Sequence, residues 1–119
     1  MERNVVGSVL KVCSCKLNTG FLRDGFCHAT PFDRGRHTVC AKMSKAFLSF
    51  TKEKGTDLTS PRPEFGFPGL KEGDFWCLCV LRWIQAWEAG VAPPVVLEAC
   101  DESVLELMDL DVLQQHAIR

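Results

Sequence analysis

Residues 61–80 read Pro-Arg-Pro-Glu-Phe-Gly-Phe-Pro-Gly-Leu-Lys-Glu-Gly-Asp-Phe-Trp-Cys-Leu-Cys-Val, and they carry the clearest structural signals in the chain. Its first part is rich in proline and glycine, which favour extended backbone and tight turns and disfavour a helix. From Phe75 to Val80, large apolar residues alternate with cysteines, a period typical of a half-buried strand. Apolar residues then recur at helical spacing over 82–89, where Gly90 ends the pattern. A structured loop, a strand and a helix are therefore expected in succession.

The chain on either side of this stretch predicts further short elements. Strands are expected at 5–12, 37–42, 95–99 and 104–108, and helices at 45–54 and from Asp109 to about His116. The segments 13–36 and 56–74 lack periodicity, and loops of that length in a compact domain are usually functional. We therefore predict one compact α+β domain over residues 4–117, with a small mixed sheet of about three to five short strands, about three helices and two long structured loops.

Composition excludes several classes of protein. The chain has 119 residues, of which 46% are hydrophobic and 24% are charged, and its formal net charge is −1. These values are those of an ordinary globular domain, without the basic excess that nucleic-acid binding requires. The sequence contains no run of 18 apolar residues and no signal-peptide pattern. A cytoplasmic protein is expected, with no nucleic-acid or membrane partner, and a protein partner is left undetermined.

Charged side chains are concentrated in the two long loops, among glycines and prolines that restrict backbone shape. Arginine suits the bidentate capture of a carboxylate or phosphate, and a neighbouring carboxylate can accept a proton. The alternative is that these charges form salt bridges that stabilise loops lacking regular hydrogen bonds. As ligand-binding candidates we select Arg23, Arg62, Lys71 and Asp74. As catalytic candidates we select Asp24, His37 and Glu64, with Asp24 or Glu64 orienting His37 beside Cys40.

Seven cysteines are present, which is a high and odd number. Because cytosolic thiols are kept reduced, a full disulfide framework is disfavoured. Cys77 and Cys79 face the same way on the expected strand, a spacing that suits two ligands of one metal better than a bond between them. Three interpretations stay open: buried structural thiols, a metal site, and reactive or disulfide-forming thiols.

Several longer motifs resemble the domain of unknown function family 2237. They are Gly20-Phe21-Leu22-Arg23-Asp24-Gly25, His37-Thr38-Val39-Cys40-Ala41, the run from Pro61 to Lys71 with Gly73-Asp74, Trp76-Cys77-Leu78-Cys79, Arg82-Trp83 and Ala92 to Ala99. The resemblance implies a short, stand-alone, mostly bacterial protein, and it implies no established activity. It also favours one set of metal or redox candidates, Cys13, Cys27, Cys40, Cys77 and Cys79 with His37, because family sequences do not generally match Cys15, His28 or Cys100.

Three functions follow as hypotheses. The first is a small-ligand-binding or enzymatic domain whose site lies between loops 21–40 and 61–74; the residues do not decide between an enzyme and a binding domain. The second is a thiol-redox or metal-binding protein that uses the five cysteines with His37. The third is a non-catalytic interaction module using the segment 98–113, which holds six acids and no base. No motif requires a cofactor, although a bound metal is compatible with the cysteines.

Overall fold

The computed structural model describes residues 2–14, 16–17 and 19–118, so Met1, Cys15, Asn18 and Arg119 lie outside the described residues. It is a mixed α+β domain. In chain order, the elements are strand β1 (His37–Lys42), helix α1 (Lys45–Glu53), 3₁₀ helix η1 (Pro63–Phe65), strand β2 (Phe75–Cys79), helix α2 (Val80–Glu88), 3₁₀ helices η2 (Leu97–Ala99) and η3 (Glu102–Glu106), and helix α3 (Leu110–Gln115).

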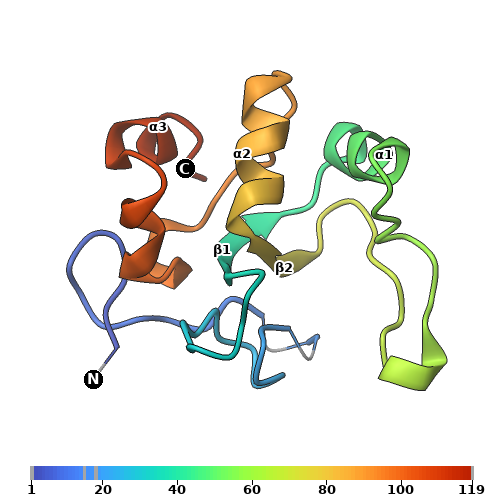
Figure 1. The fold of residues 1–119 in the computed structure, drawn as a ribbon, viewed down its shortest axis with the longest axis horizontal. Coiled ribbons are helices and arrows are strands. Elements are labelled where there is room, and N and C mark those ends of the chain that lie inside the picture. Colours follow the sequence, from blue (N-terminus) through green and yellow to red (C-terminus); the bar gives the residue numbers. More distant parts are fainter. Residues whose placement is uncertain (1, 15, 18, 119) are drawn as a thin grey trace.

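A two-stranded antiparallel sheet lies at the centre of the molecule (Figure 1). Cys40 of β1 lies directly opposite Cys77 of β2, so these side chains share one face of the sheet. An irregularity near the start of β1 shifts the register and places His37 opposite Cys79. The sheet therefore brings two cysteines together at its middle and a cysteine and a histidine together at its end.

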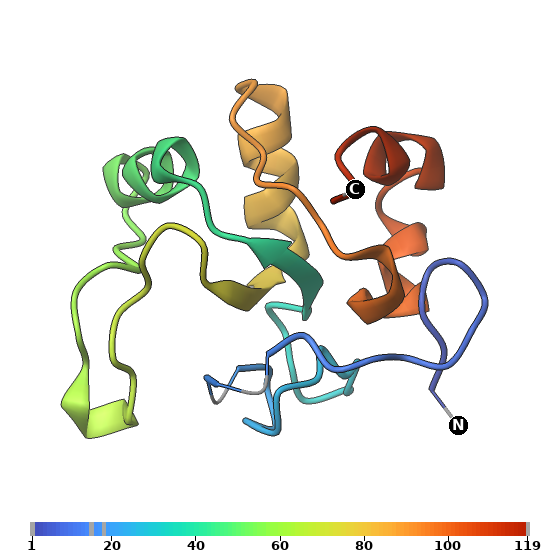
Figure 2. The same ribbon diagram turned by 180° about the vertical axis from the view of Figure 1, so that it is seen from behind.

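Helices α1, α2 and α3 lie on one side of this sheet, and most of the irregular N-terminal third of the chain lies on the other (Figures 1 and 2). Helix α1 begins where expected, because the Ser44 hydroxyl accepts the backbone N–H of Phe47 at 3.2 Å. Helix α2 buries Trp83, whose indole N–H donates to the Pro93 carbonyl at 3.0 Å. His116, after α3, packs edge-on against Trp83 at 5.4 Å between ring centroids. None of the described helices is long and apolar enough to cross a membrane.

The strand expected at 5–12 is wrong. Buried Asn4 organises this segment as a turn: its amide donates to the Ser8 hydroxyl and the Glu98 carbonyl, at 2.8 and 3.0 Å, and accepts the Ser8 N–H. Gly7 has a φ of +88°, which a β-carbon disfavours. Apolar residues in this segment therefore cover the core from a turn and not from a sheet.

The strands expected at 95–99 and 104–108 are also wrong, and three to five strands are not found among the described residues. Val95 makes only isolated bridges, with Ala41 and with Ala117, because the preceding residues, Pro93 and Pro94, have no N–H to donate and the chain then turns into η2. Residues 102–106 form η3, where the Asp101 carboxylate accepts the Ser103 N–H at 2.9 Å.

Candidate functional site

A cavity of about 560 Å³ lies between the first long loop and the segment that follows α1. In Figure 1 this segment, which carries η1, extends away from α1 at the side of the molecule. Residues of β2 complete the cavity, and its volume is within the range of small-molecule sites. Its lining residues are Gly20, Phe21, Arg23, His37, Gly55, Thr56, Asp57, Leu58, Arg62, Phe65, Phe67, Trp76 and Cys77.

His37 is the titratable ring that lines this cavity, and a buried carboxylate fixes it. Asp33 Oδ1 lies 2.8 Å from His37 Nδ1, while Asp33 Oδ2 accepts the backbone N–H of His37 at 2.8 Å. The Asp33 side chain is only 2% exposed, so solvent competes little for it. A carboxylate on Nδ1 holds the proton there and leaves Nε2 as the acceptor. No described residue hydrogen-bonds Nε2, so it is available to a ligand.

The loop from 33 to 37 explains how the dyad forms. Arg36 has a φ of +49°, and the Arg36 N–H donates to the Asp33 carbonyl at 3.1 Å, so the chain turns back on itself within four residues. A β-carbon on Gly35 would lie 2.6 Å from His37 Cε1, so only glycine leaves room for the ring in this position. The expectation that Asp24 or Glu64 orients His37 is wrong, because that carboxylate belongs to Asp33. The signal in the sequence was an acid and a histidine four residues apart around a glycine.

Aromatic rings and two arginines form the rest of the wall. Phe67 meets Trp76 edge-on, with 5.2 Å between ring centroids. Arg62 and Arg23 also line the cavity. Asp57 lines it too, but its carboxylate accepts the hydroxyls of Ser60 and Thr59 and the Thr59 N–H, which lowers its pKa. The cavity wall therefore combines the flat apolar rings of Phe67 and Trp76 with the side chains of two arginines.

A smaller cavity of about 80 Å³ adjoins the first, and five residues line both. It is bounded by His37 on one strand and by Cys79, directly opposite, on the other. Cys79 is partly exposed and forms no disulfide. Cys79 therefore places a thiol that forms no disulfide at the strand position opposite His37.

The remaining candidates lie elsewhere. Glu64 is in exposed η1 and does not line the cavity, and Lys71 and Asp74 form their own turn, in which the Lys71 N–H donates to the Asp74 carboxylate at 2.9 Å. Asp24 pairs with His28, with 2.6 Å between Oδ2 and Nε2, and does not contact His37. Of the ligand-binding and catalytic candidates, the cavity brings together Arg23, His37 and Arg62.

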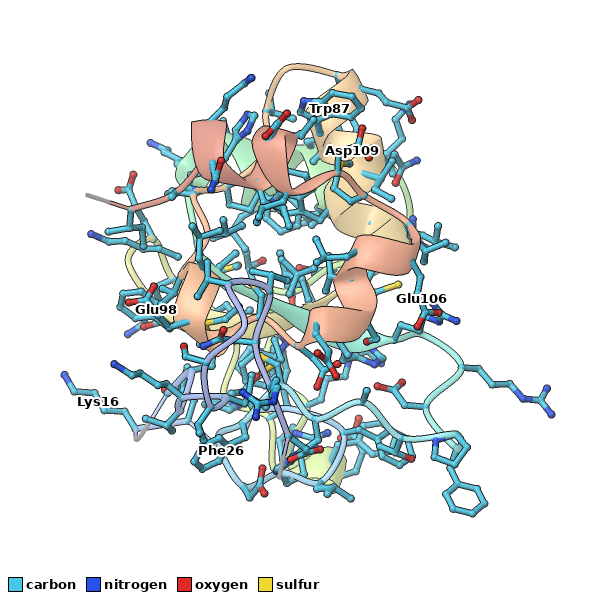
Figure 3. The ribbon with its side chains drawn as sticks, turned by 90° about the vertical axis from the view of Figure 1, so that its left-hand side faces the viewer. Lys16, Phe26, Trp87, Glu98, Glu106 and Asp109 are labelled. Atoms are coloured by element: carbon cyan, nitrogen blue, oxygen red, sulfur yellow. A yellow bond between two sulfur atoms is a disulfide. The ribbon has the colours of Figure 1, made fainter. Side chains whose placement is uncertain are left out.

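Asp24, His28 and Glu2 form a separate cluster that ties the N-terminal arm to the first loop. Burial opposes the charged ring, but hydrogen bonds and charges from Asp24 and Glu2 outweigh it and raise the pKa of His28. Burial likewise opposes ionisation of Asp24, but the N–H of Phe26 and the His28 ring outweigh it and lower the pKa of Asp24. The loop around Phe26 is seen at the base of Figure 3.

Four of the five cysteine candidates form two disulfides, Cys13–Cys40 and Cys27–Cys77. Disulfide-forming thiols, one of the three interpretations left open, therefore describe these four residues, because folding brings partners 27 and 50 residues apart into bonding contact. The sulfur atoms of Cys13, Cys27 and Cys77 all lie within 4.8 Å of one another. The two disulfides are thus in contact through Cys13, and neither Cys40 nor His37 is part of the group of three.

Gly20 packs the first loop against this sulfur cluster. Its φ is +90°, and a β-carbon there would overlap the Phe26 carbonyl oxygen and lie 3.7 Å from Cys77 Sγ. The neighbouring Thr19 hydroxyl accepts the Cys77 N–H at 2.7 Å. Gly20 and Cys77 also line the larger cavity, so one of the four disulfide-bonded cysteines forms part of the cavity wall.

Comparison with known proteins places the chain in a family but assigns no activity. The model of a family described as an uncharacterized protein conserved in bacteria matches residues 3–117, nearly the whole chain. No curated protein matches the sequence.

Proposed function

We propose that this chain, which belongs to the DUF2237 family, binds a small anionic molecule with a flat apolar part in the cavity between residues 20–37 and 55–67. Arg62, beside the aromatic wall, is suited to a carboxylate or phosphate group, and the rings of Phe67 and Trp76 are suited to an aromatic or planar apolar group.

The observation that carries the proposal is the Asp33–His37 pair at the edge of this cavity. A histidine held through Nδ1 by a buried carboxylate presents Nε2 as a proton acceptor in a fixed direction. A ligand bound between these aromatic rings and Arg62 lies in the same cavity that His37 lines. His37 Nε2 can therefore accept a proton from a bound ligand, which is the role of a general base in an enzyme.

Binding can be tested with simple probes. Benzoate and phenyl phosphate carry the expected groups, and benzyl alcohol lacks the charge. Backbone amide NMR shifts, with tryptophan fluorescence, give the site and the dissociation constant. We expect the anions to shift the signals of Phe21, Phe67 and Trp76, and we expect benzyl alcohol to bind at least about tenfold more weakly, because a charge-assisted hydrogen bond is lost.

Matched variants separate the site from general charge. Arg62→Ala should weaken phenyl phosphate at least about tenfold, whereas Arg34→Ala, which removes an exposed arginine outside the cavity, should leave binding unchanged. Asp33→Asn should change the tautomer of His37 in ring ¹⁵N spectra without unfolding the protein. Saturating probe that moves no cavity signal, or equal loss in both arginine variants, contradicts the proposal.

A thiol or metal function is our second candidate, because three sulfur atoms from the two disulfides lie within 4.8 Å of one another. The interaction module stays a prediction. Figure 3 labels three of its acidic residues, with Glu98 and Glu106 at opposite edges of the face in view and Asp109 near its top. Glu106 is also engaged by Arg36, with 3.3 Å between Oε1 and the guanidinium.

A further inference from the structure

Four buried cysteines form two neighbouring disulfides between the sheet and the N-terminal loop. Cys40 and Cys77 come from directly opposite positions on β1 and β2, and Cys13 and Cys27 come from the loop that covers them. Cys27 and Cys40 are fully buried, and Cys77 and Cys13 are 1% and 8% exposed. Each disulfide joins one sheet cysteine to one loop cysteine. Four separate parts of the chain therefore contribute cysteines to two neighbouring disulfides, and three of the four sulfurs lie within 4.8 Å of one another.

We propose that these four cysteines, once reduced, form a tetrahedral tetrathiolate site for one Zn²⁺ ion, and that the two disulfides are the oxidised form of the same site. In such a site, zinc–sulfur bonds of about 2.3 Å place the sulfur atoms about 3.8 Å apart. Three of the sulfurs, from both disulfides, already lie within 4.8 Å of one another. The fourth, on Cys40, is bonded to Cys13 but lies farther than 4.8 Å from at least one of the other two, so it must move closer to them when the metal binds.

The contact between the disulfides is what distinguishes a shared site from two independent cross-links. A disulfide tethers its two segments wherever it lies, so tethering alone does not require two of them to touch. A metal requires all four sulfurs around one centre. The soft thiolate set and closed, buried surroundings match a structural zinc site, which keeps no open position. Cys79 and His37 line the smaller cavity, form no bond with these four cysteines and are not ligands in this proposal.

The interconversion balances. A dithiol reductant gives each disulfide two electrons and two protons, which yields two thiols while the reductant becomes a disulfide. The four thiols then bind Zn²⁺ as thiolates and release four protons. Oxidation of the four thiolates by two equivalents of a disulfide oxidant reforms both bonds and expels the metal. Both states cross-link residues 13–36 to the sheet, a stretch with no described helix or strand.

The zinc site and the anion site proposed for the cavity rest on different residues, and anion binding is measured on the oxidised chain, which binds no zinc. Cys77 lines the cavity, and Gly20 packs against its sulfur. Loss of anion binding would therefore leave the zinc proposal intact, and loss of zinc binding would leave the anion site intact.

Cobalt and zinc titrations test the site. The full chain is reduced with dithiothreitol, freed of reductant without oxygen, and titrated with Co²⁺. We expect thiolate-to-cobalt charge-transfer absorption and tetrahedral d–d bands that saturate at one ion per chain and disappear when Zn²⁺ is added. The oxidised chain should give neither. Folded, reduced protein that shows no tetrahedral thiolate spectrum overturns the proposal.

Variants identify the ligands. Cys27→Ala and Cys40→Ala should each weaken Zn²⁺ at least about a hundredfold, since even changes outside the ligand shell cost tenfold to a hundredfold. Cys79→Ala and Cys100→Ala, which remove the two described free thiols, should not weaken it. Should the ligand variants fail to fold, the melting temperature of the reduced natural chain with and without Zn²⁺ decides. An increase with Zn²⁺ supports the site, and no change overturns it.

Discussion

Removing the Cys27–Cys77 disulfide should cost about 4 kcal/mol of folding free energy. The bond joins residues 50 apart. Cross-linking a loop of that length restricts the unfolded chain by about 4 kcal/mol at room temperature in the chain-entropy relation. The Cys13–Cys40 bond spans 27 residues and gives about 3.5 kcal/mol by the same relation. The longer loop should therefore contribute slightly more.

The double variant Cys27→Ala/Cys77→Ala measures this, because it leaves no unpaired thiol behind. Oxidised protein is unfolded with guanidinium in the presence of a chelator, and the transition is followed by tryptophan fluorescence. We expect the free energy of unfolding to fall by about 4 kcal/mol, and the m-value to rise because an uncrosslinked unfolded chain exposes more surface. Cys79→Ala, the matched control, removes a free thiol and should cost about 1 kcal/mol or less.

The chain-entropy explanation is refuted if the double variant loses less than about 1 kcal/mol with an unchanged m-value. That result would mean that packing alone holds the first loop against β2. A large loss with an unchanged m-value would instead locate the effect in the folded state, in contacts around Gly20 and Thr19.

Two further predictions concern titration and thiol chemistry. The raised pKa of His28 stabilises the fold fully below pH 6.5 and less as pH rises through its folded value, while the lowered pKa of Asp24 stabilises it fully above pH 3.8. His28→Gln should therefore lower the free energy of unfolding most between pH 3.8 and pH 6.5, by about 1 kcal/mol or less because the cluster is partly exposed. Unfolding curves across pH measure this loss, and a loss that does not depend on pH contradicts the prediction. Burial raises the pKa of the Cys100 thiol to about 12, so iodoacetamide at neutral pH should modify Cys79 at least about tenfold faster in peptide maps, and equal rates would contradict it.

Local signals in the sequence predicted those elements whose ends are marked by neighbouring residues. Ser44 accepts the N–H that begins α1, alternation identified β2 within a residue, and the segment expected to be extended at 37–42 is β1. The two strands expected after residue 94 failed for a different reason. A β-branched run forms a strand only if a partner strand lies beside it, and here the flanking prolines and turns leave Val95 with two isolated bridges.

The candidate site divides in the same way. Proline and glycine in both loops indicated where backbone shape is restricted, and Arg23, His37 and Arg62 do line one cavity. The partner of His37 was missed, because Asp33 reaches the ring only through the tight turn at Arg36.

Composition and pattern by themselves determined a small α+β domain, its principal helices, both strands of its sheet and the loops that contain its polar residues. Only the tertiary structure decided the pairing of the cysteines. Residues 13, 27, 40 and 77 are separated by long stretches of chain, and no local signal records which of them meet. Pairing depends on the register of Cys40 against Cys77 and on how the first loop folds over them, and both are set by long-range packing.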